Sequence, residues 1–280
     1  MQGKVCVITG GNSGIGRAMA EQIAPLGAHV VLVCRHPERG REALEDLRRK
    51  TGSDRFELVL ADLSVRDQIR RAAKEIRARH PTVHVLVNNA GVYLPKRRVT
   101  SDGLEAMFAT NHLAPFLLTH ELTDVLQAAA PGRVITVSSE GHRMGELDFG
   151  DLQAERRFRA LKQYCTTKLQ NILFTRELSR RFERRGIVAC AFHPGGVRTG
   201  FAQDEPGGFG LLVRLVSPFL RTPEKAARTG TFLASSEESS RLAGAYFADG
   251  KPKQPAPAAL REDLSARLWE VTAQLAGVAA

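Results

Sequence analysis

The chain has 280 residues, of which 43% are hydrophobic, and a formal net charge of +10. That length and apolar content favour a single domain, spanning residues 1–280, with a sizeable core. No apolar run reaches the roughly 18–20 residues that span a bilayer, so we expect no integral membrane segment. Four scattered cysteines without metal-ligand spacing, and no room for a signal peptide before the first strand, predict a reduced, cytoplasmic protein without a bound metal.

The positive charge raises the question of a nucleic-acid partner. The basic residues are, however, spread along amphipathic helical stretches at 48–50, 70–74, 156–159 and 180–185. No aromatic stacking platform for bases interleaves with them. Solvated helix faces explain the charge better, so we expect no nucleic-acid partner. Part of the excess charge suits an anionic phosphate cofactor.

Short β-branched runs alternate with helical periodicities along the chain. The predicted strands are Val5–Thr9, His29–Cys34, Phe56–Ala61, Val83–Asn88, Arg133–Ser138, Val188–Phe192 and Gly244–Ala248. The predicted helices are Ile15–Leu26, Pro37–Lys50, Val65–His80, Gly103–Ala128 and Tyr164–Arg185. Continuous apolar strands separated by helices imply a buried parallel sheet covered on both faces. With right-handed crossovers this is an α/β, doubly wound Rossmann fold with a mainly parallel seven-stranded sheet.

Two segments depart from this rhythm. Residues 200–222 have a strongly apolar middle, which predicts a lid over a bulky hydrophobic substrate, although an ordinary packing helix would look similar. The Phe209–Leu220 run and the arginines near it leave peripheral membrane docking as another interpretation. Residues 251–280 predict a proline-rich loop followed by a short amphipathic helix that contains Trp269.

A glycine-rich turn follows the first predicted strand. Gly10, Gly14 and Gly16 permit tight turning and close backbone approach. The helix that starts near Ile15 offers free N–H groups at the switch point of the sheet, where ligands bind. The turn therefore predicts a site for a dinucleotide pyrophosphate, with a purely structural turn as the alternative. The predicted contact residues are Gly10, Asn12, Ser13, Gly14, Ile15 and Gly16.

The second predicted strand ends in Cys34 and is followed by Arg35. A site that prefers NAD usually carries an acid here to bind the ribose 2′-hydroxyl, and this chain has none. The Arg35 guanidinium suits a 2′-phosphate instead. We therefore predict NADP(H) as the cofactor, unless Arg35 merely points to solvent.

The next two strands end in further cofactor candidates. Asp62, followed by Leu63, could accept a hydrogen bond from the adenine amino group or cap the helix after it, and the sequence favours neither. In the next turn, small residues around Asn88, Ala90 and Gly91 let the backbone lie against a cofactor. An ordinary Asn-Gly turn would look similar.

Tyr164 and Lys168 stand four residues apart, on one face of a predicted helix. A free tyrosine has a pKa of about 10. A nearby ammonium and an oxidised nicotinamide favour the phenolate and lower that pKa, which suits Tyr164 to proton transfer. The fifth strand ends at Ser138 and Ser139, where a hydroxyl could hold a substrate carbonyl beside Tyr164 or simply cap a helix.

Together these residues resemble the short-chain dehydrogenase/reductase family over residues 1 to about 250. The resemblance rests on Thr9-Gly10-x-x-x-Gly14-x-Gly16, Asp62, Asn88-Asn89-Ala90-Gly91, Asn111, Ser139, Tyr164-x-x-x-Lys168 and Pro194-Gly195 with Thr199. It implies that Tyr164 is the general acid/base and that Lys168 lowers its pKa and binds the nicotinamide ribose. It also implies that Ser139 orients the substrate oxygen and that Asn111 holds a water linking Lys168 to solvent. The implied lining of the nicotinamide side is Pro194, Gly195, Val197 and Thr199.

Within that family the chain resembles the retinol dehydrogenase and protochlorophyllide reductase branch. Ser139 and Tyr164 stand farther apart than the serine and tyrosine of most members. The segments that carry the resemblance are Leu147-Asp148-Phe149, Asp151-Leu152-Gln153, Tyr164-Cys165, Asn171-Ile172-Leu173-Phe174 and Arg267-Leu268-Trp269. The branch favours Ser139 over Ser138 and, together with Arg35, implies NADPH.

We therefore predict an NADP(H)-dependent oxidoreductase that transfers a hydride between the nicotinamide and a hydrophobic small molecule, which is an alcohol, an aldehyde or a ketone. A tailoring ketoreductase for a polycyclic natural product and a non-catalytic NADPH-sensing protein are the alternatives. The helices Asn111–Ala128 and Tyr164–Arg185 could form the four-helix seam of a homodimer, although both also serve the core.

Overall fold

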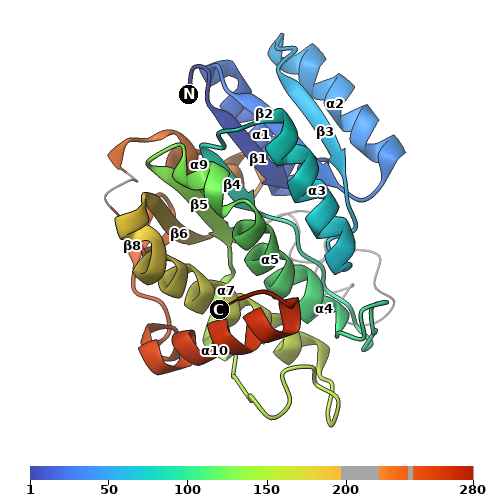
Figure 1. Cartoon of the computed structure of the whole chain (residues 1–280), viewed down its shortest axis with the longest axis vertical. Coiled ribbons are helices and arrows are strands. Elements are labelled where there is room, and N and C mark those ends of the chain that lie inside the picture. The colour runs from blue at the N-terminus through green and yellow to red at the C-terminus, as the bar shows by residue number, and fades with distance from the viewer. Residues whose placement is uncertain (197–220, 239–241, 280) are drawn as a thin grey trace.

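The computed structural model describes residues 1–196, 221–238 and 242–279. Their strands form one sheet in the order β3-β2-β1-β4-β5-β6-β7-β8 (Figure 1). The strands are β1 Val5–Thr9, β2 His29–Cys34, β3 Phe56–Leu60, β4 Val85–Asn88, β5 Gly132–Val137, β6 Ile187–His193, β7 Tyr246–Ala248 and β8 Lys251–Lys253. Strands β1 to β7 pair in parallel, and β8 pairs antiparallel with β7. The predicted doubly wound, mainly parallel sheet is confirmed.

The structure adds β8 to the seven predicted strands. Its sequence predicts a loop because Pro252 has no N–H to donate to a sheet ladder. β8 is the edge strand, however, and pairs only with β7, where Pro252 lies opposite Phe247. Its residues are exposed, and an edge strand tolerates both proline and lysine. The described sheet therefore has eight strands rather than seven.

Helices of several lengths connect the strands. The longer ones are α1 Gly14–Ile23, α2 Pro37–Thr51, α3 Arg66–Arg79, α5 Ala114–Glu121, α7 Ala160–Phe182, α9 Pro223–Ser235 and α10 Glu262–Ala276. The short segments are η1 Ala24–Leu26, α4 Ala106–Phe108, η2 Ala109–Leu113, α6 Thr123–Gln127, η3 Glu140–Met144, η4 Glu183–Arg185 and η7 Pro257–Leu260. Among the helices of the described residues, none has both the length and the apolar composition of a membrane-spanning helix.

Two predictions about helices were incomplete. The helix predicted over Gly103–Ala128 is broken into α4, the π-helical turn η2, α5 and α6. Helix α9 was not predicted, although its sequence carries two start signals. Pro223 occupies its first turn, and the Thr222 hydroxyl accepts a hydrogen bond from the backbone N–H of Lys225.

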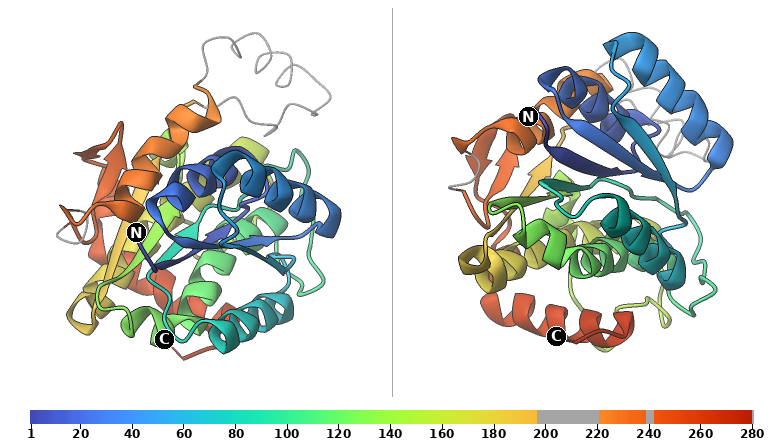
Figure 2. Two further views of the ribbon diagram at one scale, coloured as in Figure 1. Left: turned by 90° about the horizontal axis from the view of Figure 1, so that it is seen from above. Right: turned by 45° about the horizontal axis from the view of Figure 1, so that its top comes forward.

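Helices cover both faces of the sheet (Figure 2). On one face α1 packs against α9, where a Cβ on Gly230 would lie 2.7 Å from the Met19 sulfur and 2.8 Å from the Phe192 ring. The absence of a side chain at Gly230 therefore lets α9 approach α1 and β6 closely. On the other face α3, α5 and α7 bury a second core that contains Phe116.

Helix α10 forms an outer layer over α5 and α7 (Figure 2). Its Trp269 is buried, with its ring centroid 4.8 Å from that of Phe116 and 6.0 Å from that of Phe174. The face that α10 covers belongs to the two helices predicted to form a dimer seam. A homodimer stays a prediction. A dimer interface on this face has to include α10, because α10 covers both helices.

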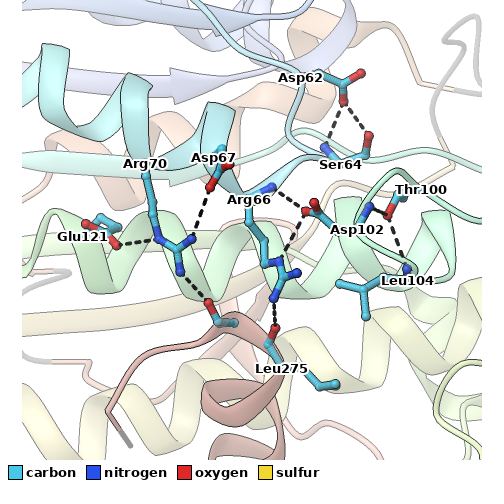
Figure 3. Close-up of polar contacts among 11 residues, drawn as sticks. Asp62, Ser64, Arg66, Asp67, Arg70, Thr100, Asp102, Leu104, Glu121 and Leu275 are labelled. Carbon is cyan, nitrogen blue, oxygen red and sulfur yellow. Dashed lines mark hydrogen bonds and ion pairs between the residues drawn. The ribbon is translucent and has the colours of Figure 1, made fainter.

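Two arginines of α3 hold the C-terminal end of α10 (Figure 3). Arg66 donates a hydrogen bond to the Leu275 carbonyl at 2.8 Å. Arg70 donates one to the Ala276 carbonyl at 2.7 Å. The last carbonyls of a helix lack intrahelical partners and carry partial negative charge, so guanidinium groups satisfy both needs.

Replacing Trp269 by alanine is expected to lower the free energy of unfolding by about 3–5 kcal/mol, because it removes a large buried side chain and leaves a cavity under α10. Unfolding in guanidinium chloride measures this change. The exposed Glu270 on the same helix is the control, and its alanine variant should stay within about 0.5 kcal/mol of the parent. Equal stability of the two variants would contradict the packing of α10 described above.

Candidate active site

The carboxyl ends of β1 and β4 meet where the strand order reverses direction, the place at which open α/β sheets bind ligands. The Thr9 hydroxyl joins these two strand ends. It accepts hydrogen bonds from the backbone N–H groups of Asn89 at 2.9 Å and Ala90 at 3.0 Å. The Asn89 side chain donates in return to the Thr9 carbonyl at 2.8 Å. The turns after β1 and β4 are thereby fixed against each other.

The turn after β1 requires glycine at three positions. Gly10 and Gly14 have φ values of +65° and +54°, a region that favours glycine. A Cβ on Gly16 would lie 2.6 Å from the Gly10 carbonyl oxygen. The N-cap residue Ser13 makes no side-chain cap to α1, so the first-turn N–H groups suit an anion. The predicted residues Gly10, Asn12, Ser13, Gly14, Ile15 and Gly16 all lie in this turn and the start of α1.

Arg35 and Asp62 follow β2 and β3 at the same edge of the sheet. The Arg35 side chain is 59% exposed, and its Nη1 lies 3.7 Å from Asp62 Oδ2. The other oxygen of Asp62 accepts hydrogen bonds from the Ser64 backbone N–H at 2.9 Å and hydroxyl at 2.7 Å (Figure 3). Asp62 therefore stabilises the turn that leads into α3, and contact with an adenine stays a prediction. Leu63 is buried beside it.

The structure brings Asn111, Ser139, Tyr164 and Lys168 together. Lys168 Nζ lies 5.5 Å from the centre of the Tyr164 ring, and the Ser139 side chain hydrogen-bonds to Tyr164. A Cβ on Gly91 would lie 3.3 Å from Asn111 Oδ1 and 3.6 Å from Lys168 Nζ. The turn after β4, the π-helical turn η2 and α7 therefore converge on one point beside the glycine turn.

The two serines after β5 point to different partners. Ser138 is buried, and its hydroxyl donates to the backbone carbonyl of Lys168 at 2.7 Å. Ser139 instead accepts a hydrogen bond from the Gly141 N–H at 3.2 Å and contacts Tyr164. Spacing alone left these two residues unresolved. The geometry assigns Ser138 to holding α7 and leaves Ser139 as the serine that faces Tyr164.

Asn111 and Lys168 are held by backbone groups. The Asn111 amide donates to the Val92 carbonyl at 2.9 Å, and its Oδ1 accepts from the Val92 N–H at 2.7 Å. Asn111 lies in η2, and such π-helical turns often occur at functional sites. Lys168 Nζ donates to the Val137 carbonyl at 3.2 Å. Both polar heads are therefore fixed against the turn after β4 and the end of β5.

Burial governs the protonation of the candidate acid and base. It lowers the pKa of Lys168 to about 8. Burial also raises the pKa of Tyr164, while the hydrogen bond from Ser139 opposes that rise. The net effect for the chain alone is a raised pKa of Tyr164, and the lowering of that pKa by the Lys168 ammonium stays a prediction.

Two residues that contact this cluster, His142 and Tyr93, were not predicted from the sequence. His142 is fully buried; its Nδ1 lies 2.7 Å from the Ser139 carbonyl, and its Nε2 accepts a hydrogen bond from the Ala256 N–H at 3.0 Å. This pairing places the proton on Nδ1. Tyr93 packs edge-on against Tyr164, with ring centroids 5.8 Å apart. His142 thus ties the Ser139 backbone to a segment more than a hundred residues away.

The remaining predicted cofactor residues have different outcomes. Asn88 is buried and donates to a threonine hydroxyl of α5 at 3.1 Å, so its side chain fixes β4 to that helix. Pro194 and Gly195 directly follow β6, and Gly195 has a φ of +89°. Val197 and Thr199 lie outside the described residues, as does the predicted lid up to residue 220.

Fold and site together define a dinucleotide-binding α/β protein, and comparison with known proteins names its family. The profile of the short chain dehydrogenase family matches residues 4–207, and the chain belongs to this family. Human retinol dehydrogenase 12 is 39% identical over 278 residues, which cover 99% of this chain and 88% of that protein. Human retinol dehydrogenase 11 is 37% identical, with coverage of 99% and 87%. The predicted resemblance to the retinol dehydrogenase branch is confirmed.

Solved structures agree with this assignment. An uncharacterised protein from Mycobacterium paratuberculosis superposes with a TM-score of 0.79 at 28% identity and covers 99% of this chain and 94% of its own. The L-sorbose reductase of Gluconobacter frateurii, solved with NADPH and L-sorbose, superposes with a TM-score of 0.72 at 26% identity, covering 89% and 96%. The chain is accordingly a dehydrogenase/reductase of the short-chain type.

The depressed pKa of Lys168 makes stability depend on pH. Between its folded value of about 8 and its ordinary value of 10.5, the unfolded chain binds more protons than the folded one, so this group makes the free energy of unfolding rise with pH. Below that window the buried ammonium costs about 3 kcal/mol. Lys168→Met is therefore expected to be more stable than the parent near pH 7, and this advantage should shrink as the pH rises through the window.

Chemical unfolding of the two proteins across that pH range measures the difference directly. Other titrating groups are common to both proteins and cancel in the comparison. A stability difference that does not vary with pH would show that Lys168 keeps its ordinary pKa in the folded chain.

Proposed function

We propose that this protein is an NADP(H)-dependent oxidoreductase that transfers a hydride between the nicotinamide and a hydrophobic alcohol, aldehyde or ketone. The observation that supports this proposal most is the convergence of Ser139, Tyr164, Lys168 and Asn111 beside the glycine turn. A protein that only senses NADPH does not need a tyrosine that is hydrogen-bonded to a serine and lies under a buried lysine. That arrangement favours catalysis over sensing.

The residues present fit a phosphorylated dinucleotide. The uncapped start of α1 and the glycine turn suit a pyrophosphate. Arg35 presents an exposed guanidinium at the end of β2, where a 2′-phosphate would need a cation. NADPH in the crystal of the similar L-sorbose reductase agrees with this choice. When bound, the cofactor supplies or accepts the hydride.

The side chains of the cluster divide the proton chemistry. In the reductive direction the Tyr164 phenol donates its proton to the substrate oxygen, and its raised pKa keeps that proton in place until the oxygen becomes basic. The Ser139 hydroxyl orients the same oxygen. Lys168, over the Tyr164 ring, stabilises the phenolate that forms. Its pKa of about 8 lets it exchange protons near neutral pH.

The names of the relatives support a hydrophobic substrate. The retinol dehydrogenases reported above are named for retinol, an apolar alcohol. A cytoplasmic location stays a prediction.

Oxidation of NADPH with a panel of hydrophobic aldehydes and ketones tests this function. We expect turnover by the parent and its loss in Tyr164→Phe, which removes the proton donor but keeps the ring. Ser139→Ala should lose most of kcat, roughly 100-fold or more for a group that binds the reacting oxygen. Ser138→Ala is the matched control and should keep more activity than Ser139→Ala.

Two outcomes would contradict the proposal. Tight NADPH binding without turnover of any carbonyl in the panel would favour the sensing alternative. A larger rate loss in Ser138→Ala than in Ser139→Ala would reverse the assignment of the two serines.

Arg35→Ala tests the choice of cofactor. A charge-assisted hydrogen bond contributes about 1.5–3 kcal/mol, so the ratio of the NADH to the NADPH dissociation constant should fall by roughly 10- to 100-fold. Fluorescence titration of both nucleotides measures that ratio. Arg41→Ala, on the exposed face of α2, controls for the loss of one positive charge. An unchanged ratio in Arg35→Ala would remove this residue from the cofactor site.

A further inference from the structure

A second cluster of chemistry-bearing side chains lies at the opposite edge of the sheet. His29 is the first residue of β2, Glu57 is the second residue of β3, and His80 directly follows α3. Arg35 and Asp62, in contrast, follow the carboxyl ends of the same two strands. The cluster is therefore remote from the cofactor edge, and the proposed reaction does not use it.

The three side chains offer their ligand atoms to a common point. His29 Nε2 lies 2.6 Å from Glu57 Oε1, and His80 Nε2 lies 3.3 Å from Glu57 Oε2. All three ligand atoms fall within 4.8 Å of one another. Tetrahedral zinc with bonds of about 2.0–2.1 Å places neighbouring ligand atoms roughly 3.3 Å apart. The contact between His29 and Glu57 has to open by less than an ångström to admit the ion, and the other ligand atoms already lie within 4.8 Å of one another.

The contact between His29 and Glu57 is one that a cation can replace. His29 Nε2 is enclosed and lies 2.6 Å from Glu57 Oε1 without the alignment of a hydrogen bond. When Nε2 carries its lone pair, the imidazole and the carboxylate oxygen can both bind one metal ion. The side chains remain 12–30% exposed, which leaves a route for an ion and a place for a water ligand.

We propose that His29, Glu57 and His80 form a Zn²⁺ site that joins the end of α3 to the amino ends of β2 and β3. Two imidazoles and one carboxylate are a donor set that zinc accepts, and three protein ligands leave a fourth position for water. The chain segments joined by the ion are far apart in the sequence. Because only the folded chain brings the three ligands together, metal binding stabilises the folded state.

The positive charge of Arg79 disfavours a cation at this site, and this effect provides a further test. Its Nη1 lies 3.4 Å from Glu57 Oε2, while its Nη2 pairs with Glu75 at 2.5 Å. A guanidinium so close to the carboxylate repels a divalent cation. Removing this charge without touching a ligand should therefore tighten zinc binding.

Calorimetric titration of ZnCl₂ into the EDTA-treated, full-length protein tests the site. We expect one saturable Zn²⁺ per chain, and a melting temperature raised by roughly 5–10 °C at 100 times the dissociation constant. His80→Ala and Glu57→Gln should weaken binding at least tenfold. His120→Ala removes a half-buried histidine of α5 outside the cluster and should bind zinc like the parent.

Arg79→Gln keeps the test decisive even where a ligand variant fails to fold. This variant should bind Zn²⁺ several-fold more tightly than the parent. No saturable binding by the parent, or the same affinity in parent, His80→Ala and Glu57→Gln, would overturn the site. Weaker or unchanged binding by Arg79→Gln would overturn it as well. NADPH turnover is a separate readout, and we expect it to be the same with and without EDTA.

Discussion

The close approach of the turns after β1 and β4 is the constraint on which the rest of the site depends. The Thr9 hydroxyl accepts two backbone N–H groups of the second turn, and a Cβ on Gly10 would lie 3.1 Å from the Ala90 backbone. Glycine is therefore needed at Gly10 for space as well as for its φ of +65°. Because Gly91 in the same turn abuts Asn111 and Lys168, this one contact places the proposed phosphate site beside the proposed proton-transfer cluster.

At the buried Lys168, stability and the proposed chemistry compete. Lys168 is only 4% exposed, its ammonium donates to the Val137 carbonyl, and no carboxylate of the described residues pairs with it. A buried charge of this kind lowers the stability of the folded state, and the proposed reaction is a reason for the chain to keep it. The surroundings nevertheless hold it firmly, because Ser138 binds the carbonyl of the same residue. The serine that does not face Tyr164 thus positions the helix that carries Tyr164.

Much of the fold and part of the site follow from the sequence. Continuous apolar runs such as His29–Cys34 predict buried strands, and the spacing of Tyr164 and Lys168 predicts that they share a helix face. The choice between Ser138 and Ser139 needed the structure, because both residues follow the same strand. His142 and the cluster around Glu57 were not foreseen, since their partners come from segments distant in the sequence. The π-helical turn at Asn111 likewise interrupts a pattern that predicts one continuous helix.

The C-terminal segment contributes to the site although the family profile ends at residue 207. The Ala256 N–H binds His142, and His142 in turn contacts the carbonyl of Ser139. Beyond it, α10 is held at its end by Arg66 and is packed through Trp269 onto α5 and α7. The position of Ser139 therefore depends on residues outside the family core. A change at the contact between Ala256 and His142 therefore offers a physical route to altering the proposed substrate site, because this contact reaches Ser139 rather than Tyr164 or Lys168.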